Sequence, residues 1–295
     1  MKLIKNITLA TVLCLSGLSA HTLWVTSMES FTHKPGHTTV GLGWGHSLPF
    51  DDILNGPAKV IVEEFSITSP NKEKTLLDIP KMKPTEPTKK AKDFEVYDAQ
   101  LGLQKIALKK DSTKGTYLIQ AKTKPTFYTR YVDNKDRKRM KLKPKNEVKG
   151  IKKLLFSVKF EVQANTYLTL DKWTEQKATG KGLEIIPKSD LSNLKVGDMV
   201  KFEVLLHGKP LDSYTKIGQG HAFISASSNA FGAGKGFSLM AGVEKGIAKF
   251  EVQSIGQWRV MVNHSQIVTK DGPLKDLYGK VDSVVYSSPL TFHVK

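Results

Sequence analysis

Short apolar runs separated by Gly, Pro, Asn and Lys dominate the chain, and few stretches keep the spacing of an amphipathic helix. Within these runs apolar and polar residues alternate, and β-branched and aromatic residues are frequent, which favours strands. The seven clearest runs are TTVGL (38–42), KVIVEEFS (59–66), GTYLIQAK (115–122), LLFSVKFEVQ (154–163), MVKFEVLL (199–206), IAKFEVQ (247–253) and WRVMVN (258–263). The pattern predicts an all-β protein.

A polar connector with several Gly and Lys residues, 174–182, divides the strand pattern into two halves. After it, a strand, a VGD turn, a second strand and an HGKP turn follow one another, which is the order of a small antiparallel sandwich. Gly208 stands in the second turn, where a positive φ costs glycine little. We place the boundary near residue 178, which predicts domains over 21–177 and 178–295, each long enough to bury its own core.

The first 20 residues have the three-part form of a secretory signal peptide. Lys2 and Lys5 precede an apolar stretch over 7–18, and Ser19-Ala20 closes the segment. That stretch is shorter than the roughly 20 residues that span a bilayer. We expect cleavage after Ala20, export to the periplasm, and no transmembrane span in the mature chain.

Composition narrows the choice of partner. The 295 residues carry 45 Lys and Arg against 28 Asp and Glu, a formal charge of +17, which becomes +15 without the two signal lysines. Such an excess indicates nucleic acid in an intracellular protein, but export argues against that partner. A solvated basic face, attraction to anionic membrane or wall surfaces, and docking on an acidic partner stay open. Of two Lys-dense stretches, 71–93, with its spaced prolines, is expected to be a loop or an edge crossing, and 133–153 a long exposed hairpin or loop. Solvated charge is the simplest interpretation of both.

Cleavage after Ala20 makes His21 the first residue of the mature chain and removes Cys14, the only cysteine of the sequence. The α-amine, with an ordinary pKa near 7.7 to 8, and the imidazole of His21 can together chelate one metal ion. Such nitrogen donors suit Ni, Co, Cu and Zn. His46, in GLGWGHSLPFDD (41–52), is the predicted second ligand, because it follows a predicted strand. Antiparallel neighbours bring the end of one strand beside the start of the other.

His37, in FTHKPGHTTV, and His264, in VMVNHSQ, are weaker candidate ligands. An exposed turn explains His37 without function, and His264 belongs to the second half, so it contributes only across the domain interface. A histidine in a turn at the end of a strand is more often structural than a ligand, and this alternative applies to His46 as well. The mature chain has no Gly-x-Ser-x-Gly elbow, no His-Glu-x-x-His motif and no cysteine nucleophile, so we expect no enzyme.

Several motifs in this order resemble the DUF4198 family, the NikK-like periplasmic components associated with nickel and cobalt uptake. They are AHTLW (20–24), GWGHSLPF (43–50), GLEIIP (182–187), VGDMVKFEVLLHGKPL (196–211), GQWRVMVNH (256–264) and SSPLTFHV (287–294). The resemblance implies two antiparallel β-sandwich domains, the second similar to transthyretin-like or carboxypeptidase-regulatory-like modules. His21 and His46 match the family's N-terminal histidine and its Gly/Thr-His-(x)-Pro-Phe element. The chain departs from the family by Leu48 within HSLPF, where relatives have His-Pro-Phe, and by its Lys-rich insertions.

The leading hypothesis is therefore a periplasmic protein that binds a divalent transition metal, nickel or cobalt by preference, and delivers it to a membrane uptake transporter. The resemblance implies that this transporter is often an energy-coupling-factor ABC system. Two alternatives remain: a copper enzyme whose N-terminal histidine forms a brace, and a metal-free adhesion or assembly module. The residues alone do not choose nickel or cobalt over copper or zinc, because the general affinity order favours copper at nitrogen sites.

Overall fold

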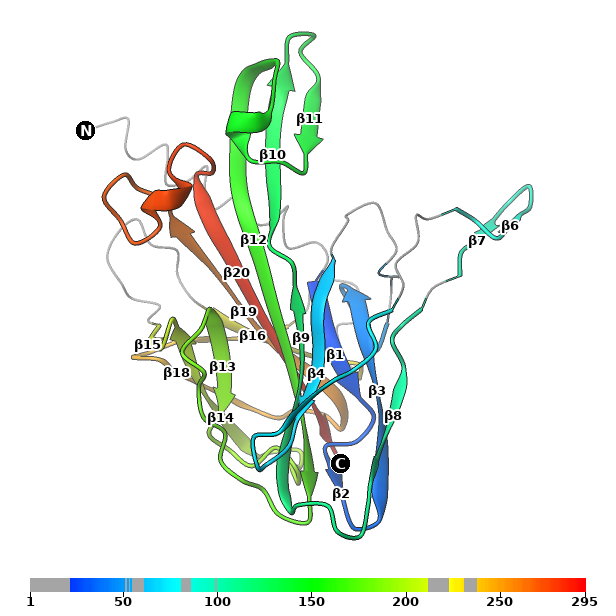
Figure 1. The fold of residues 1–295 in the computed structure, drawn as a ribbon. Helices are drawn as coiled ribbons and strands as arrows, with labels where there is room; N and C mark the ends of the chain where they lie inside the picture. The colour runs from blue at the N-terminus through cyan, green and yellow to red at the C-terminus, as the bar shows by residue number, and fades with distance from the viewer. Residues whose placement is uncertain are drawn as a thin grey trace.

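The structure, a computed structural model, describes residues 22–50, 52, 54, 61–80, 86–98, 100–211, 223–230 and 238–295. Their regular structure is almost entirely strand, with two short 3₁₀ turns, η1 (Lys145–Glu147) and η2 (Lys275–Leu277). Several sheets pack in a sandwich-like arrangement, which confirms the predicted all-β class (Figure 1).

Twelve of the strands precede residue 171. They are β1 (Thr22–Ser27), β2 (Phe31–Thr32), β3 (Gly36–Gly45), β4 (Val62–Thr68), β5 (Lys74–Leu76), β6 (Lys89–Lys90), β7 (Glu95–Val96), β8 (Gln104–Leu108), β9 (Gly115–Thr123), β10 (Thr126–Asp133), β11 (Lys138–Lys141) and β12 (Ile151–Leu170). The others are β13 (Leu183–Pro187), β14 (Met199–Leu206), β15 (Lys209–Pro210), β16 (Phe223–Ser228), β17 (Leu239–Gly242), β18 (Ile247–Glu251), β19 (Gly256–Ile267) and β20 (Ser283–Val294). Each of the seven predicted runs overlaps one of these strands.

The largest sheet is built around β12, which is 20 residues long. The strand order is β17-β16-β19-β20-β12-β9-β4-β5, with β10, β11 and β2 attached at the side. Along one edge β12 pairs first with β10 and then with β9, and along the other it pairs with β20 in parallel. The parallel pairing joins residues 158–166 to residues 283–291 and so crosses the predicted boundary at 178. The two halves share one sheet, and the division into 21–177 and 178–295 stays a prediction.

Two hydrophobic cores lie on opposite faces of this sheet, because side chains of a strand alternate between its faces. The first core consists mainly of residues from the first half of the chain and includes even-numbered residues of β12 such as Val158 and Val162. The second core consists mainly of residues from the second half and includes Tyr167 of β12. On β20 the parity is reversed: Val285 joins the first core and Val284 joins the second. Each core therefore takes most of its residues from one half of the chain and completes itself with a strand of the other.

Three smaller sheets complete the fold. β1, β3 and β8 form one antiparallel sheet, β13, β14, β15 and β18 form another, and β6 pairs with β7 in a hairpin. β1 packs on β20 and β12 of the large sheet. Two side chains of the large sheet fix this contact, since Thr291 Oγ1 donates to the Val25 carbonyl at 2.5 Å and Gln257 Nε2 donates to Thr26 Oγ1 at 2.5 Å.

Trp24 fills the contact between β1 and the large sheet, and its side chain is fully buried. Gly43 lies directly opposite Trp24 in the β1–β3 pairing. A Cβ atom at residue 43 would lie 2.0 Å from Trp24 Nε1 and 2.1 Å from Trp24 Cε2. Glycine is therefore needed here because the indole occupies the space that any side chain would take.

Replacing Gly43 by Ala should lower the free energy of unfolding by at least about 1–3 kcal/mol, the usual cost of an overpacked core. Urea denaturation measures the change. In a Trp24→Leu background, which removes the indole, the same Gly43→Ala substitution should cost much less. An equal cost in both backgrounds would show that contact with the indole is not what requires glycine.

Candidate functional site

His21, the first predicted ligand, lies outside the described residues, but the strand that begins directly after it is described. β1 and β3 are antiparallel, and Thr22 pairs with Gly45. His46 follows Gly45 in the chain. The start of β1 and the end of β3 therefore meet at one end of the three-stranded sheet, as the prediction of an antiparallel neighbour requires.

The backbone of His46 is held by a side chain from the second half of the chain. Arg259, on β19, donates from Nη2 to the His46 carbonyl at 2.6 Å. The guanidinium carbon of Arg259 also lies 4.6 Å from the centre of the Trp24 ring. A guanidinium stacked on an indole gains a cation–π attraction and keeps its in-plane donors for hydrogen bonds. Arg259 is only 8% exposed, whereas the His46 residue is exposed, so the backbone is anchored and the histidine faces solvent.

The loop that carries His46 is fixed at two further points. Trp24 Nε1 donates to the Pro49 carbonyl at 3.3 Å. The backbone N–H of Asp52 donates to the Trp44 carbonyl at 3.2 Å, in an isolated antiparallel bridge. The bridge places Asp52 opposite Trp44, the residue before Gly45 on β3. The sequence shows the Asp51-Asp52 pair directly after Pro49-Phe50, but no pattern in it predicted a role for Asp52.

His37 lies near the opposite end of β3, where it pairs with Ala107 of β8 and is exposed. It is eight positions from Gly45 along the strand, which corresponds to about 26 Å of extended chain. The structure therefore does not bring His37 and His46 together.

His264 lies on β19 opposite Tyr286 of β20, and it is only 8% exposed. Along β19 the odd-numbered Arg259 faces β1, whereas even-numbered residues such as Val262 face the second core. His264 shares the even face and stands five positions from Arg259. The structure places it on the face of the sheet opposite the Arg259–His46 contact.

The surroundings of His264 are those of a structural, uncharged imidazole. Its Nδ1 atom is buried and has no hydrogen-bond partner among the described residues. Burial lowers the pKa of His264, because the interior disfavours the imidazolium form. Tyr286, the neighbour of His264 on β20, has its hydroxyl 3.3 Å from His207 Nε2. Burial, together with the charge of Glu161, raises the pKa of Tyr286 to about 12.

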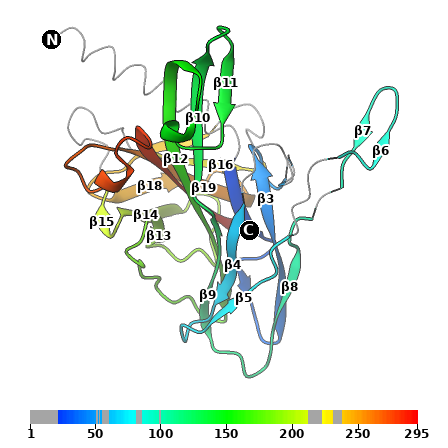
Figure 2. The ribbon, with the colours of Figure 1, turned by 45° about the horizontal axis from the view of Figure 1, so that its top comes forward.

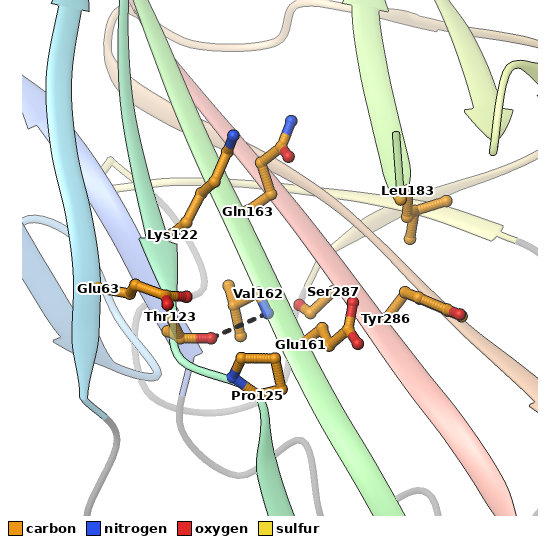
Figure 3. A pocket seen from close by; sticks show the side chains of 11 residues that line it. Glu63, Lys122, Thr123, Pro125, Glu161, Val162, Gln163, Leu183, Tyr286 and Ser287 are labelled. Carbon is orange, nitrogen blue, oxygen red and sulfur yellow. Dashed lines mark hydrogen bonds between the residues drawn. The ribbon is translucent and has the colours of Figure 1, made fainter. Parts of the chain in front are cut away.

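A cleft of about 190 Å³ lies where β9 gives way to β10 along β12 (Figure 3). Its lining residues are Glu63, Lys122, Thr123, Pro125, Glu161, Val162, Gln163, Gly182, Leu183, Tyr286 and Ser287. Two of the three charged residues that line the cleft have ion-pair partners outside it. Glu161 is 2.7 Å from Lys159, and Lys122 is 3.9 Å from Glu64. None of the lining residues is a histidine, so the cleft is separate from the predicted metal site.

Within the part of the chain that the structure describes, no group of three or more His, Cys, Asp or Glu side chains is arranged to hold a metal ion. Over the same residues, no helix has the length and apolar character needed to cross a bilayer.

These features define an all-β protein with two cores on one shared sheet and an anchored histidine loop beside the start of β1. Residues 18–266 match the family described as "Domain of unknown function (DUF4198)", and the chain belongs to this family. The family resemblance seen in the sequence is thereby confirmed, whereas its association with nickel and cobalt is not tested by the match. No curated protein matches the chain.

Comparison with solved structures finds only distant similarity. Escherichia coli alpha-2-macroglobulin activated by porcine elastase aligns with 11% identity and a TM-score of 0.22, over 93% of this chain and 20% of that one. The fibronectin(III)-like modules of Clostridium thermocellum CbhA align with 11% identity and a TM-score of 0.18, over 92% and 94% of the two chains. Murine CEACAM1b aligns with 9% identity and a TM-score of 0.18, over 93% and 99%. The chain spans about a fifth of the macroglobulin, and none of these similarities carries an argument about function.

Replacing Arg259 by Gln should lower the free energy of unfolding by about 2 kcal/mol or more, because both the cation–π contact and a charged hydrogen bond are lost. Urea denaturation measures this loss, and backbone amide exchange in residues 46–48 and in Phe50 should become faster. The exposed Arg130→Gln variant is the matched control and should change stability by less than about 0.5 kcal/mol. Unchanged exchange in the loop of the Arg259 variant would contradict the anchoring role.

The lowered pKa of His264 makes stability depend on pH. Below its ordinary pKa the unfolded chain binds a proton at this residue that the folded chain does not, so stability should fall as the pH drops from about 7.5 to 5.5. The slope from this residue is at most about 1.4 kcal/mol per pH unit. Denaturation at several pH values should show a shallower slope for His264→Gln than for the unmodified protein. Equal slopes in the two proteins would exclude this assignment.

Proposed function

We propose that the protein is an exported metal-binding protein that captures one divalent transition metal ion through His21 and His46 and passes it to a membrane uptake transporter. In this proposal the α-amine and the imidazole of His21 chelate the ion, and His46 adds a third nitrogen. Nickel and cobalt are the preferred ions because of the family resemblance, and copper or zinc would also accept these donors. The protein acts as a carrier and carries out no reaction on the ion.

One observation supports the site above all others, the pairing of Thr22 with Gly45. Paired Cα atoms of antiparallel strands lie about 4.5–5.5 Å apart, and consecutive Cα atoms about 3.8 Å apart. Because His21 precedes Thr22 and His46 follows Gly45, chain connectivity alone limits their Cα separation to about 13 Å. Neither His37 nor His264 meets the end of β3 in this way.

The surroundings of His46 also suit transfer of an ion. A carrier must hold its metal-binding side chain in place and yet let the metal-binding side chains of a partner reach the ion. The hydrogen bond from Arg259 fixes the His46 backbone while the residue stays exposed. A buried histidine such as His264 would give an incoming partner no access.

Isothermal titration of the exported protein with Ni²⁺, Co²⁺, Cu²⁺ and Zn²⁺ tests this proposal, after N-terminal sequencing of the same sample. Sequencing should begin at His21, and titration should show one site. Adding a single Gly before His21 removes the six-membered amine–imidazole chelate ring and should weaken binding by at least about 100-fold, beyond the roughly 10–100-fold typical of losing an outer-shell partner. His46→Ala should also weaken binding, whereas His37→Ala should not.

Unchanged affinity in the Gly-extended protein, or an N-terminus at another residue, would overturn the site. Release of oxidised oligosaccharides by the copper-loaded protein with a reductant would instead identify a copper enzyme that uses the same two histidines.

A further inference from the structure

A separate feature of the fold is a projecting arm of strongly basic sequence. We define the basic finger as residues 126–156, which contain β10, β11, η1 and the first part of β12. Its base, which includes Tyr128, packs against the cores, and its outer part projects from the body in two views of the molecule (Figure 1, Figure 2). The finger holds eleven Lys and Arg against three Asp and Glu, a net charge of +8 and almost half of the +17 of the whole chain.

Exposure alone does not account for this charge. The β6–β7 hairpin, over residues 86–98, also projects from the body and is mostly exposed (Figure 2). It carries three Lys and four Asp and Glu, a net charge of −1. A solvated hairpin of this chain can therefore be nearly neutral. Protection of the β11 edge from pairing with other strands needs only a few charges, fewer than the finger carries.

Most cations of the finger are not neutralised within the molecule. Asp133 is 2.9 Å from Arg137 and 3.1 Å from Arg139, and Asp136 is 2.7 Å from Lys152. Lys145 forms an ion pair with Asp282 at the base of the finger. The other seven form no ion pair with any residue of the described ranges; they are Arg130, Lys135, Lys138, Lys141, Lys143, Lys149 and Lys153.

The cations of β11 lie on both faces of this strand. All four residues of β11 are exposed. Because side chains alternate, Arg139 and Lys141 point to one face, and Lys138 and Met140 point to the other. Met140, on the same face as Lys138, is 56% exposed. A stereospecific protein interface uses one complementary face, whereas a narrow convex arm with charge on both faces fits a laterally uniform negative surface.

We propose that the basic finger binds the surface of an anionic phospholipid bilayer. Each Lys or Arg held near such a surface strengthens binding by roughly fivefold, and the attraction decays within about one Debye length, about 10 Å at 0.1 M salt. The finger brings several cations within that distance at once without inserting a helix. Met140 adds an apolar contact at the headgroup level. This binding does not depend on His21 or His46, so it goes beyond the proposed metal capture.

Co-sedimentation of the exported protein, purified without metal, with lipid vesicles tests the proposal. The protein should bind vesicles that contain about one quarter phosphatidylglycerol and should bind pure phosphatidylcholine at least about tenfold more weakly. Raising the salt from about 0.1 M to about 0.5 M should release it. The triple variant Lys138→Gln, Lys141→Gln, Lys149→Gln should bind the anionic vesicles at least about tenfold more weakly than the unmodified protein.

The matched control is Lys89→Gln, Lys90→Gln, Lys92→Gln in the β6–β7 hairpin, which removes the same charge from the other projecting arm and should lose much less affinity. Equal losses in the two triple variants would overturn the assignment to the finger. Tight binding to an acidic polypeptide, with none to anionic vesicles, would overturn the choice of a membrane surface and identify a protein partner. All six substituted lysines are exposed, so both triple variants should fold like the unmodified protein. Urea denaturation of both variants verifies this.

Discussion

The parallel pairing of β12 with β20 is the interaction on which the rest of the structure depends. Parallel neighbours need a long crossover, and here the crossover is the whole of residues 171–282, including β13 to β19. The pairing joins both halves into one sheet, so each half packs its own core against a face that the other half helps to form. The shared sheet gives the short N-terminal sheet of β1, β3 and β8 one continuous surface against which β1 packs.

The position of the candidate site follows from that surface. β1 packs on β12 and β20, and Trp24 is buried in the contact. Arg259 reaches across from β19 to stack on Trp24 and hold the His46 carbonyl. The loop that bears the first half's candidate ligand is thus anchored by the second half, although His264, the second half's own candidate, lies on the other face of the sheet. Stability of the sheet contact and placement of His46 are coupled through one guanidinium.

The length of β12 explains why the basic finger projects from the body. Its second part pairs with β9 inside the body, and its first part continues outward to pair with β10, which in turn pairs with β11. The basic finger is therefore an extension of the central strand and is supported by it, not a loose loop. In the two proposals together, the finger holds the protein at an anionic bilayer while the exposed His46 loop offers the ion to a membrane partner.

Period-two alternation in runs such as 154–163 and 199–206 was enough to predict strands, because a strand buried on one face must alternate whatever it pairs with. The family motifs likewise predicted His46 as a candidate ligand, and this stays a prediction. Sequence could not predict that β12 pairs with β20, since strand partners far apart in the chain leave no local signal. Nor did it show that Gly43 makes room for Trp24 or that Arg259 holds the His46 loop. Those facts depend on which faces meet in space, and only the tertiary structure decides that.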